Sequence, residues 1–258
     1  MNQRKRKMTA RLRRCGRWVS DRKLWSCVVA PVVVAGIVAG LDTTYTLVTK
    51  KSPPAPVERA EMTDGVSGPS RQFFRCMPDG RCIAPDYVTI DSIANDPFVG
   101  NEAYFMTAKV LGSANPMQTE VSVKVGETVL VRALIVNDAA INAPGGHPLV
   151  AHGTRFILGI PTNSSSELPL SGRIYSSNAI PQLIHDTVFL HGKTRFTIEY
   201  DWGSAVLANR SHRGLPLSDE IIGEGDLVGS GMPNGMFPPG LANNAAVFVL
   251  VHVLPASV

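Results

Sequence analysis

The sequence contains few of the patterns that identify an enzyme or a cofactor site. There is no G-x-S-x-G segment of the kind that presents a nucleophilic serine. No acidic stretch reaches the oxygen-ligand density of an EF-hand calcium loop. No internal repeat is apparent by eye, and residues 73–258 hold no low-complexity tract. These absences argue against motif-defined hydrolases and EF-hand proteins, and leave topology and fold class as the properties that the sequence predicts most directly.

Charge is divided unevenly along a chain whose formal net charge is +4. Residues 1–51 hold twelve Lys/Arg against two acidic residues, whereas residues 52–258 hold thirteen against nineteen. A basic N-terminal arm before a mildly acidic remainder is typical of a protein held at a membrane by its N-terminus. We expect the arm, residues 1–23, to contact anionic lipid headgroups rather than nucleic acid, because Trp18 is its only aromatic residue.

An uncharged apolar run, residues 24–41, follows the basic arm. As a helix it would span about 27 Å, close to the ~30 Å hydrocarbon core of a bilayer. With the neutral residues beyond Asp42, we expect one transmembrane helix over residues 24–45. The basic flank predicts a cytoplasmic N-terminus and an extracellular C-terminal domain in a single-pass cell-membrane protein. Two alternatives remain open: a secretory signal cleaved near Gly40, and a buried helix of a soluble domain.

Residues 46–72 are predicted to form a linker, because Pro53, Pro54 and Pro56 favour an extended chain and no periodicity follows them. The remaining residues, 73–258, are of single-domain size and long enough to bury a substantial core.

The four cysteines fall into two groups relative to the predicted membrane. Cys15 and Cys27 lie in the arm and the apolar run, where no structural disulfide is expected. Cys76 and Cys82 flank a Pro-Asp-Gly turn sequence, which would bring their thiols together in an oxidising compartment. We therefore predict a Cys76–Cys82 disulfide. A metal pair is the alternative, but two thiols with no histidine nearby fall short of a zinc site.

Hydrophobic residues in the C-terminal domain recur with a period of two, which is typical of β-strands. The run at 246–253 is apolar on both faces, as in a central strand, and a Gly126-Glu127 turn predicts a hairpin between 121–125 and 128–136. Helix signals are weak, so we predict an all-β fold, an immunoglobulin-like antiparallel β-sandwich. The other strands are expected at 87–90, 102–110, 154–160, 168–176, 186–190 and 194–200, with a turn at His191-Gly192.

Six segments occur in this order along the C-terminal domain: IANDPFVGNE (93–102), IVNDAA (135–140), IPTN (160–163), GRIYSSNA (172–179), YDWGSA (200–205) and LSDEII (217–222). Together they resemble a family of actinobacterial cell-surface proteins of unknown biochemical function, which are membrane-anchored or secreted. The resemblance implies a cell-surface location and one β-sandwich ectodomain, and it supplies no catalytic residues. The chain departs from the family at residues 237–240, FPPG, where related sequences tend to have Pro-Gly-Cys, so no disulfide is expected there.

Four histidines are candidates for a zinc site if their loops meet, and surface histidines are the alternative. They are His147, His152, His185 and His191. The acidic residues of 219–226 suggest calcium ligands, although a solvated acidic turn explains them as well. The pairs Ser211-His212 and His185-Asp186 supply the residue types of a hydrolase, but adjacency in sequence does not make a triad.

The sequence therefore predicts a membrane-anchored, non-catalytic surface module with no cofactor, which contacts cell-envelope polymer, another envelope protein or an external ligand. Binding would involve its polar loops at 163–166, 176–178 and 209–212. The alternative is a metal-dependent or hydrolytic ectodomain.

Overall fold

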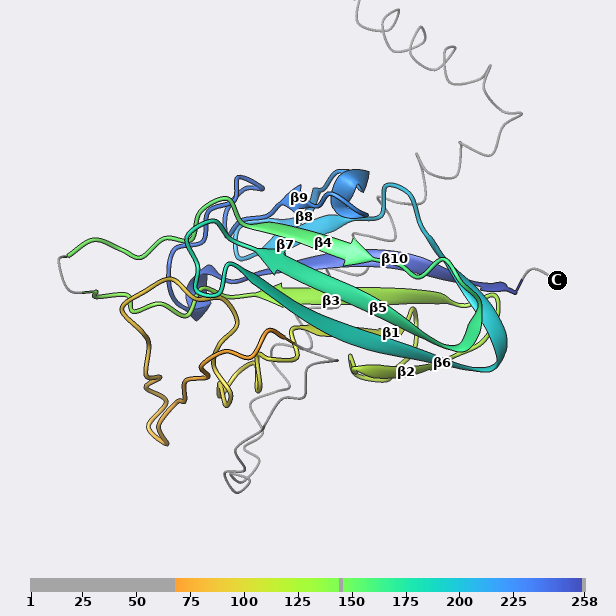
Figure 1. The fold of residues 1–258 in the computed structure, drawn as a ribbon, viewed down its shortest axis with the longest axis horizontal. Coiled ribbons are helices and arrows are strands. Elements are labelled where there is room, and N and C mark those ends of the chain that lie inside the picture. The colour runs from red at the N-terminus through yellow and green to blue at the C-terminus, as the bar shows by residue number, and fades with distance from the viewer. Residues whose placement is uncertain (1–67, 144–145, 257–258) are drawn as a thin grey trace, which may run out of the picture.

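A computed structural model describes residues 68–143 and 146–256, which are drawn in colour in Figure 1. The predicted arm, the predicted transmembrane helix at 24–45 and most of the predicted linker lie outside these residues. Among the described helices, none has the length and apolar character needed to cross a bilayer.

The described part of the chain is all-β, as predicted, with two short 3-10 helices, η1 (Asp219–Ile221) and η2 (Leu241–Asn243). Its strands are β1 (Met106–Val110), β2 (Glu120–Val123), β3 (Thr128–Ile135), β4 (Arg155–Gly159), β5 (Ser165–Tyr175), β6 (Leu183–Tyr200), β7 (Val206–Asn209), β8 (Arg213–Pro216), β9 (Asp226–Leu227) and β10 (Ala245–Pro255).

The sheet folds over on itself through the long strand β6, which gives a sandwich-like arrangement. The first part of β6 pairs with β5, and β4 and β9 continue that layer. The last five residues of β6 pair instead with β10, whose other neighbours are β3 and β7. Inward-facing side chains of β3, β4, β5, β6 and β10 form one hydrophobic core, and Figure 1 shows β4, β5 and β6 lying across β3 and β10.

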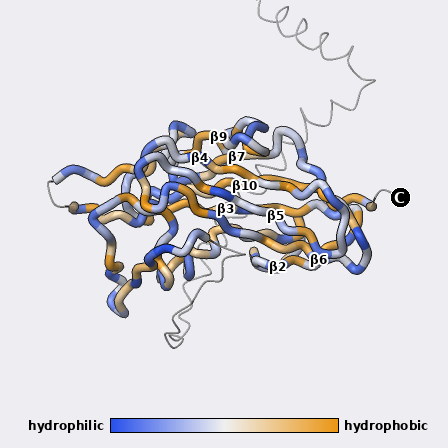
Figure 2. The backbone as a smooth tube through the Cα atoms, in the orientation of Figure 1, coloured by the Kyte–Doolittle hydropathy of each residue, from blue (hydrophilic) through white to orange (hydrophobic). Residues whose placement is uncertain are grey.

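The apolar run predicted to be a central strand is β10, which has neighbours on both sides. Seven consecutive residues of it are buried or half-buried apolar side chains, because one face meets the main core and the other a smaller cluster around Phe248. Figure 2 shows hydrophobic residues along this strand and hydrophilic residues in many loops.

The predicted hairpin of 121–125 with 128–136 is wrong. β3 pairs with β1 on one side and β10 on the other, so no edge of it is left for β2. Val121 and Val123 are buried by parallel pairing of β2 with β6 instead. Gly126 does make a turn, with a φ of 93°, but its N–H donates to Val253 O of β10.

The predicted turn at His191-Gly192 is also wrong, because both residues continue β6. The strand can continue here because Gly192 has no side chain. A Cβ at this position would lie only 2.7 Å from Cδ1 of Phe196, which packs closely against it. Residues 87–90, predicted to be a strand, make only one isolated bridge, between Ile90 and Asn137.

Residues 68–105, here called the N-terminal extension, contain no named strand and lie beside one end of the sheet (orange to yellow in Figure 1). Its contact with the sheet begins at Gly68, which exchanges backbone hydrogen bonds with His185 of β6. Residues 68–72, assigned above to the linker, therefore pack against the domain. The extension also carries the predicted cysteine pair, and the sulfur atoms of Cys76 and Cys82 lie at disulfide distance.

Candidate functional site

Four carboxylates are buried where the N-terminal extension meets the sheet: Asp91, Glu102, Asp138 and Asp186. We call them the carboxylate cluster. Asp91 and Glu102 belong to the extension, Asp138 follows β3, and Asp186 lies in β6. Ionised carboxylates are costly to bury without compensating partners, so this concentration of acids is the most unusual chemical feature of the described chain.

Asp91 is completely buried and is the only non-glycine residue with positive φ among those described, at 46°. Its N–H donates to Val136 O, and its Oδ1 accepts from the N–H of Val136 at 2.8 Å. Oδ2 has no hydrogen-bond partner within the described residues. Burial, with Asp138 nearby, raises the pKa of Asp91 well above its ordinary value.

Glu102 and Asp138 act as a pair. Oε2 of Glu102 accepts from the N–H of Ile93 at 2.9 Å, while Asp138 accepts from the backbone and hydroxyl of Ser92. Burial and the neighbouring Asp138 raise the pKa of Glu102 to about 11. Burial raises the pKa of Asp138 to about 6, and the bond from Glu102 opposes the rise. Glu102 therefore holds the proton at neutral pH and donates it to Asp138.

Asp186 accepts from the N–H groups of Met106 and Thr187, both at 2.8 Å. Burial nonetheless raises the pKa of Asp186 to about 7. The cation that faces the cluster is Arg71, whose Nη2 donates to the carbonyl of Asp91 at 2.8 Å and whose guanidinium lies over the ring of Phe73. Burial lowers the pKa of Arg71 and the four carboxylates oppose that change. One cation cannot balance four ionised acids, so the site retains protons.

A pocket of about 270 Å³ borders the cluster. Asp91 and Glu102 form its acidic wall, Tyr104 and Phe105 supply aromatic rings, and Arg132 and Thr107 lie on the opposing strands β3 and β1. Arg132 donates to the hydroxyl of Thr107 through Nε at 3.1 Å. The described residues that line the pocket include no Ser, Cys, His or Lys, so it offers hydrogen bonding and charge rather than an activated nucleophile.

The structure does not bring the four candidate zinc ligands together. His147 and His152 are exposed in the loop between β3 and β4. The ring of His185 packs beside Gly68, and His191 lies between Glu167, at 3.3 Å from Nδ1, and Glu120, at 4.0 Å from Nε2. Because the two glutamates approach opposite ring nitrogens, no single ion could join all three side chains.

The acidic loop and the serine–histidine pairs make local hydrogen bonds. Asp219 accepts from the Tyr200 hydroxyl at 2.7 Å, and Asp226 accepts from the N–H of Ser218. The N–H groups of Ser211 and His212 both donate to Asn209, which closes the β7–β8 turn. These contacts are those of turns and caps.

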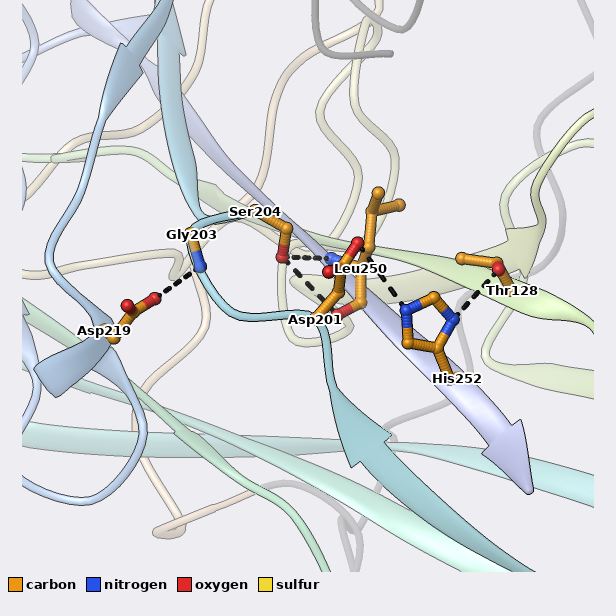
Figure 3. A network of polar contacts seen from close by, with 7 residues as sticks. All are labelled: Thr128, Asp201, Gly203, Ser204, Asp219, Leu250 and His252. Carbon is orange, nitrogen blue, oxygen red and sulfur yellow. Dashed lines mark hydrogen bonds and ion pairs between the residues drawn. The ribbon is translucent and has the colours of Figure 1, made fainter. Parts of the chain in front are cut away.

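Figure 3 shows a second polar network, at the start of β3 and the end of β6. Nδ1 of His252 lies 3.1 Å from the hydroxyl of Thr128, and Nε2 lies 3.6 Å from Asp201. The Ser204 hydroxyl instead exchanges bonds with the backbone of Leu250. Serine, histidine and aspartate are the residue types of a catalytic triad, but here the Ser204 hydroxyl is bonded to Leu250. His252 of β10 instead links that strand to Thr128 of β3 and to Asp201, which follows β6.

Within residues 68–143 and 146–256, one group of three potential metal ligands comes close together: Cys76, Cys82 and Asp96. Its two sulfur atoms are at disulfide distance from each other, and a disulfide sulfur is no thiolate ligand.

Sequence reasoning did not single out Arg71, Asp91, Glu102 or Asp138, and it considered Asp186 only beside His185. Glu102 and Asp138 do occur in the segments that resemble the cell-surface family. No local spacing links residues 71, 91, 102, 138 and 186, because the fold alone brings them together.

No protein-family model, no curated protein and no solved structure matches the chain. The resemblance to actinobacterial cell-surface proteins therefore stays a prediction.

Proposed function

We propose that this protein is a membrane-anchored, extracytoplasmic binding module. A transmembrane helix at 24–45 holds an immunoglobulin-like β-sandwich outside the cell, and the domain binds a small ligand from the envelope or the exterior without catalysing a reaction. The charge reversal after residue 51, the apolar run and the family resemblance support the location. The cleaved, secreted form of the same domain is the alternative at the N-terminus.

The observation that carries the binding proposal is the pocket between the extension and the sheet. Small-molecule sites are typically concave and mostly apolar, with a few convergent polar groups. This pocket is more polar than that, because its lining combines apolar side chains with Asp91, Asn101, Glu102, Thr107 and Arg132. One of these residues, Asp91, is buried and has an Oδ2 that is unpaired within the described residues. An enzyme is less well supported, because the candidate zinc ligands named from the sequence lie apart, and the hydroxyl of Ser204, beside His252 and Asp201, bonds to the backbone of Leu250.

The test uses the full chain in lipid nanodiscs and saturation-transfer NMR with a panel of small cationic, neutral and anionic fragments. The unmodified protein should give transfer to at least one class. Val99→Phe adds a ring at the half-buried rim of the pocket and should abolish that transfer while leaving the melting temperature nearly unchanged. Absence of any fragment signal sensitive to Val99→Phe would contradict the proposal.

A further inference from the structure

The acidic wall of the pocket specifies what kind of ligand would complete it. Asp91 is completely buried, and its Oδ2 has no hydrogen-bond partner within the described residues. Glu102, 3% exposed, stands beside it in the same wall. A buried acceptor without a donor costs free energy until a donor arrives, so the missing partner is a donor.

Charge narrows the choice of donor. Asp138 and Asp186 lie near Asp91 but do not line the pocket, and Arg71 is a cation that interacts with all four carboxylates. A cationic donor would compensate the burial of an ionised Asp91, and its hydrogen bonds are about twice as strong as those of a neutral donor. Arg132 lies on another wall and donates to Thr107, so the acids rather than that wall would hold the ligand's charge.

The rest of the pocket fits an organic cation better than a metal ion. No three ligand atoms of the cluster, among the described residues, come close enough to share one ion. The lining includes two aromatic residues, Tyr104 and Phe105, and two apolar ones, Met117 and Leu134. These are the residue types that contact a cation and an alkyl stem.

Resting on the binding function proposed above, we propose that the pocket takes a small organic ammonium ion, which donates an N–H hydrogen bond to Oδ2 of Asp91 and packs against Tyr104 and Phe105. The ligand class is thus a primary amine with a short alkyl chain.

The test titrates the full chain in nanodiscs with five probes: n-butylammonium, tetramethylammonium, n-butanol, butyrate and calcium. The first should bind at least about tenfold more tightly than n-butanol or butyrate, since a charge-assisted bond is worth about one decade or more in affinity. Tetramethylammonium has the charge but no N–H donor and should bind more weakly. Equal binding by n-butanol or by tetramethylammonium, or tighter binding by calcium, would overturn the assignment.

Asp91→Asn provides the residue-level test. Asparagine tolerates positive φ and keeps the acceptor for Val136, so the fold is retained, while the affinity for n-butylammonium should fall about tenfold. Asp186→Asn, an equally buried acid outside the pocket lining, is the matched control and should have a much smaller effect. Unchanged affinity in Asp91→Asn would overturn the proposal. If n-butanol or butyrate bind instead and Val99→Phe abolishes their binding, the binding function stands and the ammonium assignment fails; if nothing binds, both fail.

Discussion

Each of the four buried carboxylates accepts a hydrogen bond from a backbone N–H group. The acceptor–donor pairs are Asp91 with Val136, Glu102 with Ile93, Asp138 with Ser92, and Asp186 with Met106. Two of these pairs, Asp91 with Val136 and Asp138 with Ser92, join the extension to the segment that follows β3. Asp186 joins β6 to the first residue of β1, and Glu102 braces the extension internally. At the scale of residues, the acids replace the ladder hydrogen bonds that the extension lacks, and satisfy buried donors at the cost of desolvation.

Glu102→Gln should leave stability nearly unchanged at neutral pH, by less than about 1 kcal/mol. Because Glu102 carries a proton, the glutamine amide can donate to Asp138 in its place while its oxygen still accepts from Ile93. Glu102→Ala removes both bonds and leaves buried groups unpaired, and should cost about 2–4 kcal/mol. Urea unfolding of both variants measures the difference. Equal destabilisation would show that residue 102 is ionised in the native state.

At the scale of elements, β6 and the extension determine the architecture. β6 belongs to both layers because its two ends have different neighbours, β5 with β2 and then β10. The extension has no ladder and is fixed by isolated backbone bonds such as those between Gly68 and His185, by side chains and by a local hairpin. In that hairpin the N–H of Met77 donates to Arg81 O at 2.7 Å beside the cysteine pair. An element without a ladder relies on such individual contacts, so local cross-links matter most there.

The predicted Cys76–Cys82 bond should be found by mass spectrometry of non-reduced peptides as a linked pair. Replacing both cysteines by serine should lower the free energy of unfolding by roughly 2 kcal/mol at most, because the bond closes only a short loop. The sheet should remain folded, as circular dichroism would show. Alkylation of both thiols without prior reduction would refute the bond.

At the scale of the whole molecule, the protons held by the cluster connect stability to pH. Burial raises the pKa values of Asp138 and Asp186, to about 6 and about 7, above the ordinary 3.8. A raised folded-state pKa contributes stability that is complete below the unfolded pKa and is lost as pH rises through the folded value. The contribution of these two groups is therefore lost between about pH 4 and pH 7.

Thermal unfolding of the full chain in nanodiscs should accordingly shift to lower temperature between pH 5 and pH 8. A loss of roughly 2 kcal/mol corresponds to a fall of about 4–8 °C for a domain of this size. Asp186→Asn removes one titrating group and should reduce the slope. A melting temperature that rises over the same interval would contradict the assignment of protons to the cluster.

The predicted topology places residues 1–23 inside and the β domain outside the cell. A protease added to intact cells or protoplasts should remove the domain and leave the basic arm protected, since the bilayer shields only the cytoplasmic side. Full protection of the chain would refute this orientation. Release of the domain into the medium without protease would instead favour cleavage near Gly40.

Strand existence could be read largely from the sequence, because a half-buried strand imposes alternation on its own residues. Val121 and Val123, or Phe196 and Ile198, are buried as that alternation requires. The apolar residues of β10 occur on both faces of the strand, so both faces had to be covered in the folded protein. The turn chemistry around Pro78 and Gly80 brought the two cysteines together, since only six positions separate them.

Pairing and the candidate site were decided by the tertiary structure. The partner of β2 could not be inferred from a turn at Gly126, because competition among β1, β2 and β10 for the edges of β3 is settled only when the whole sheet forms. That Asp91 and Asp186 lie in one buried cluster could not be predicted either, because in the sequence they are ordinary acidic residues ninety-five positions apart. Alternation is a property of neighbouring residues, and so the sequence by itself determined it. Shared burial of distant charges depends on which surfaces meet, and only the folded chain determined that.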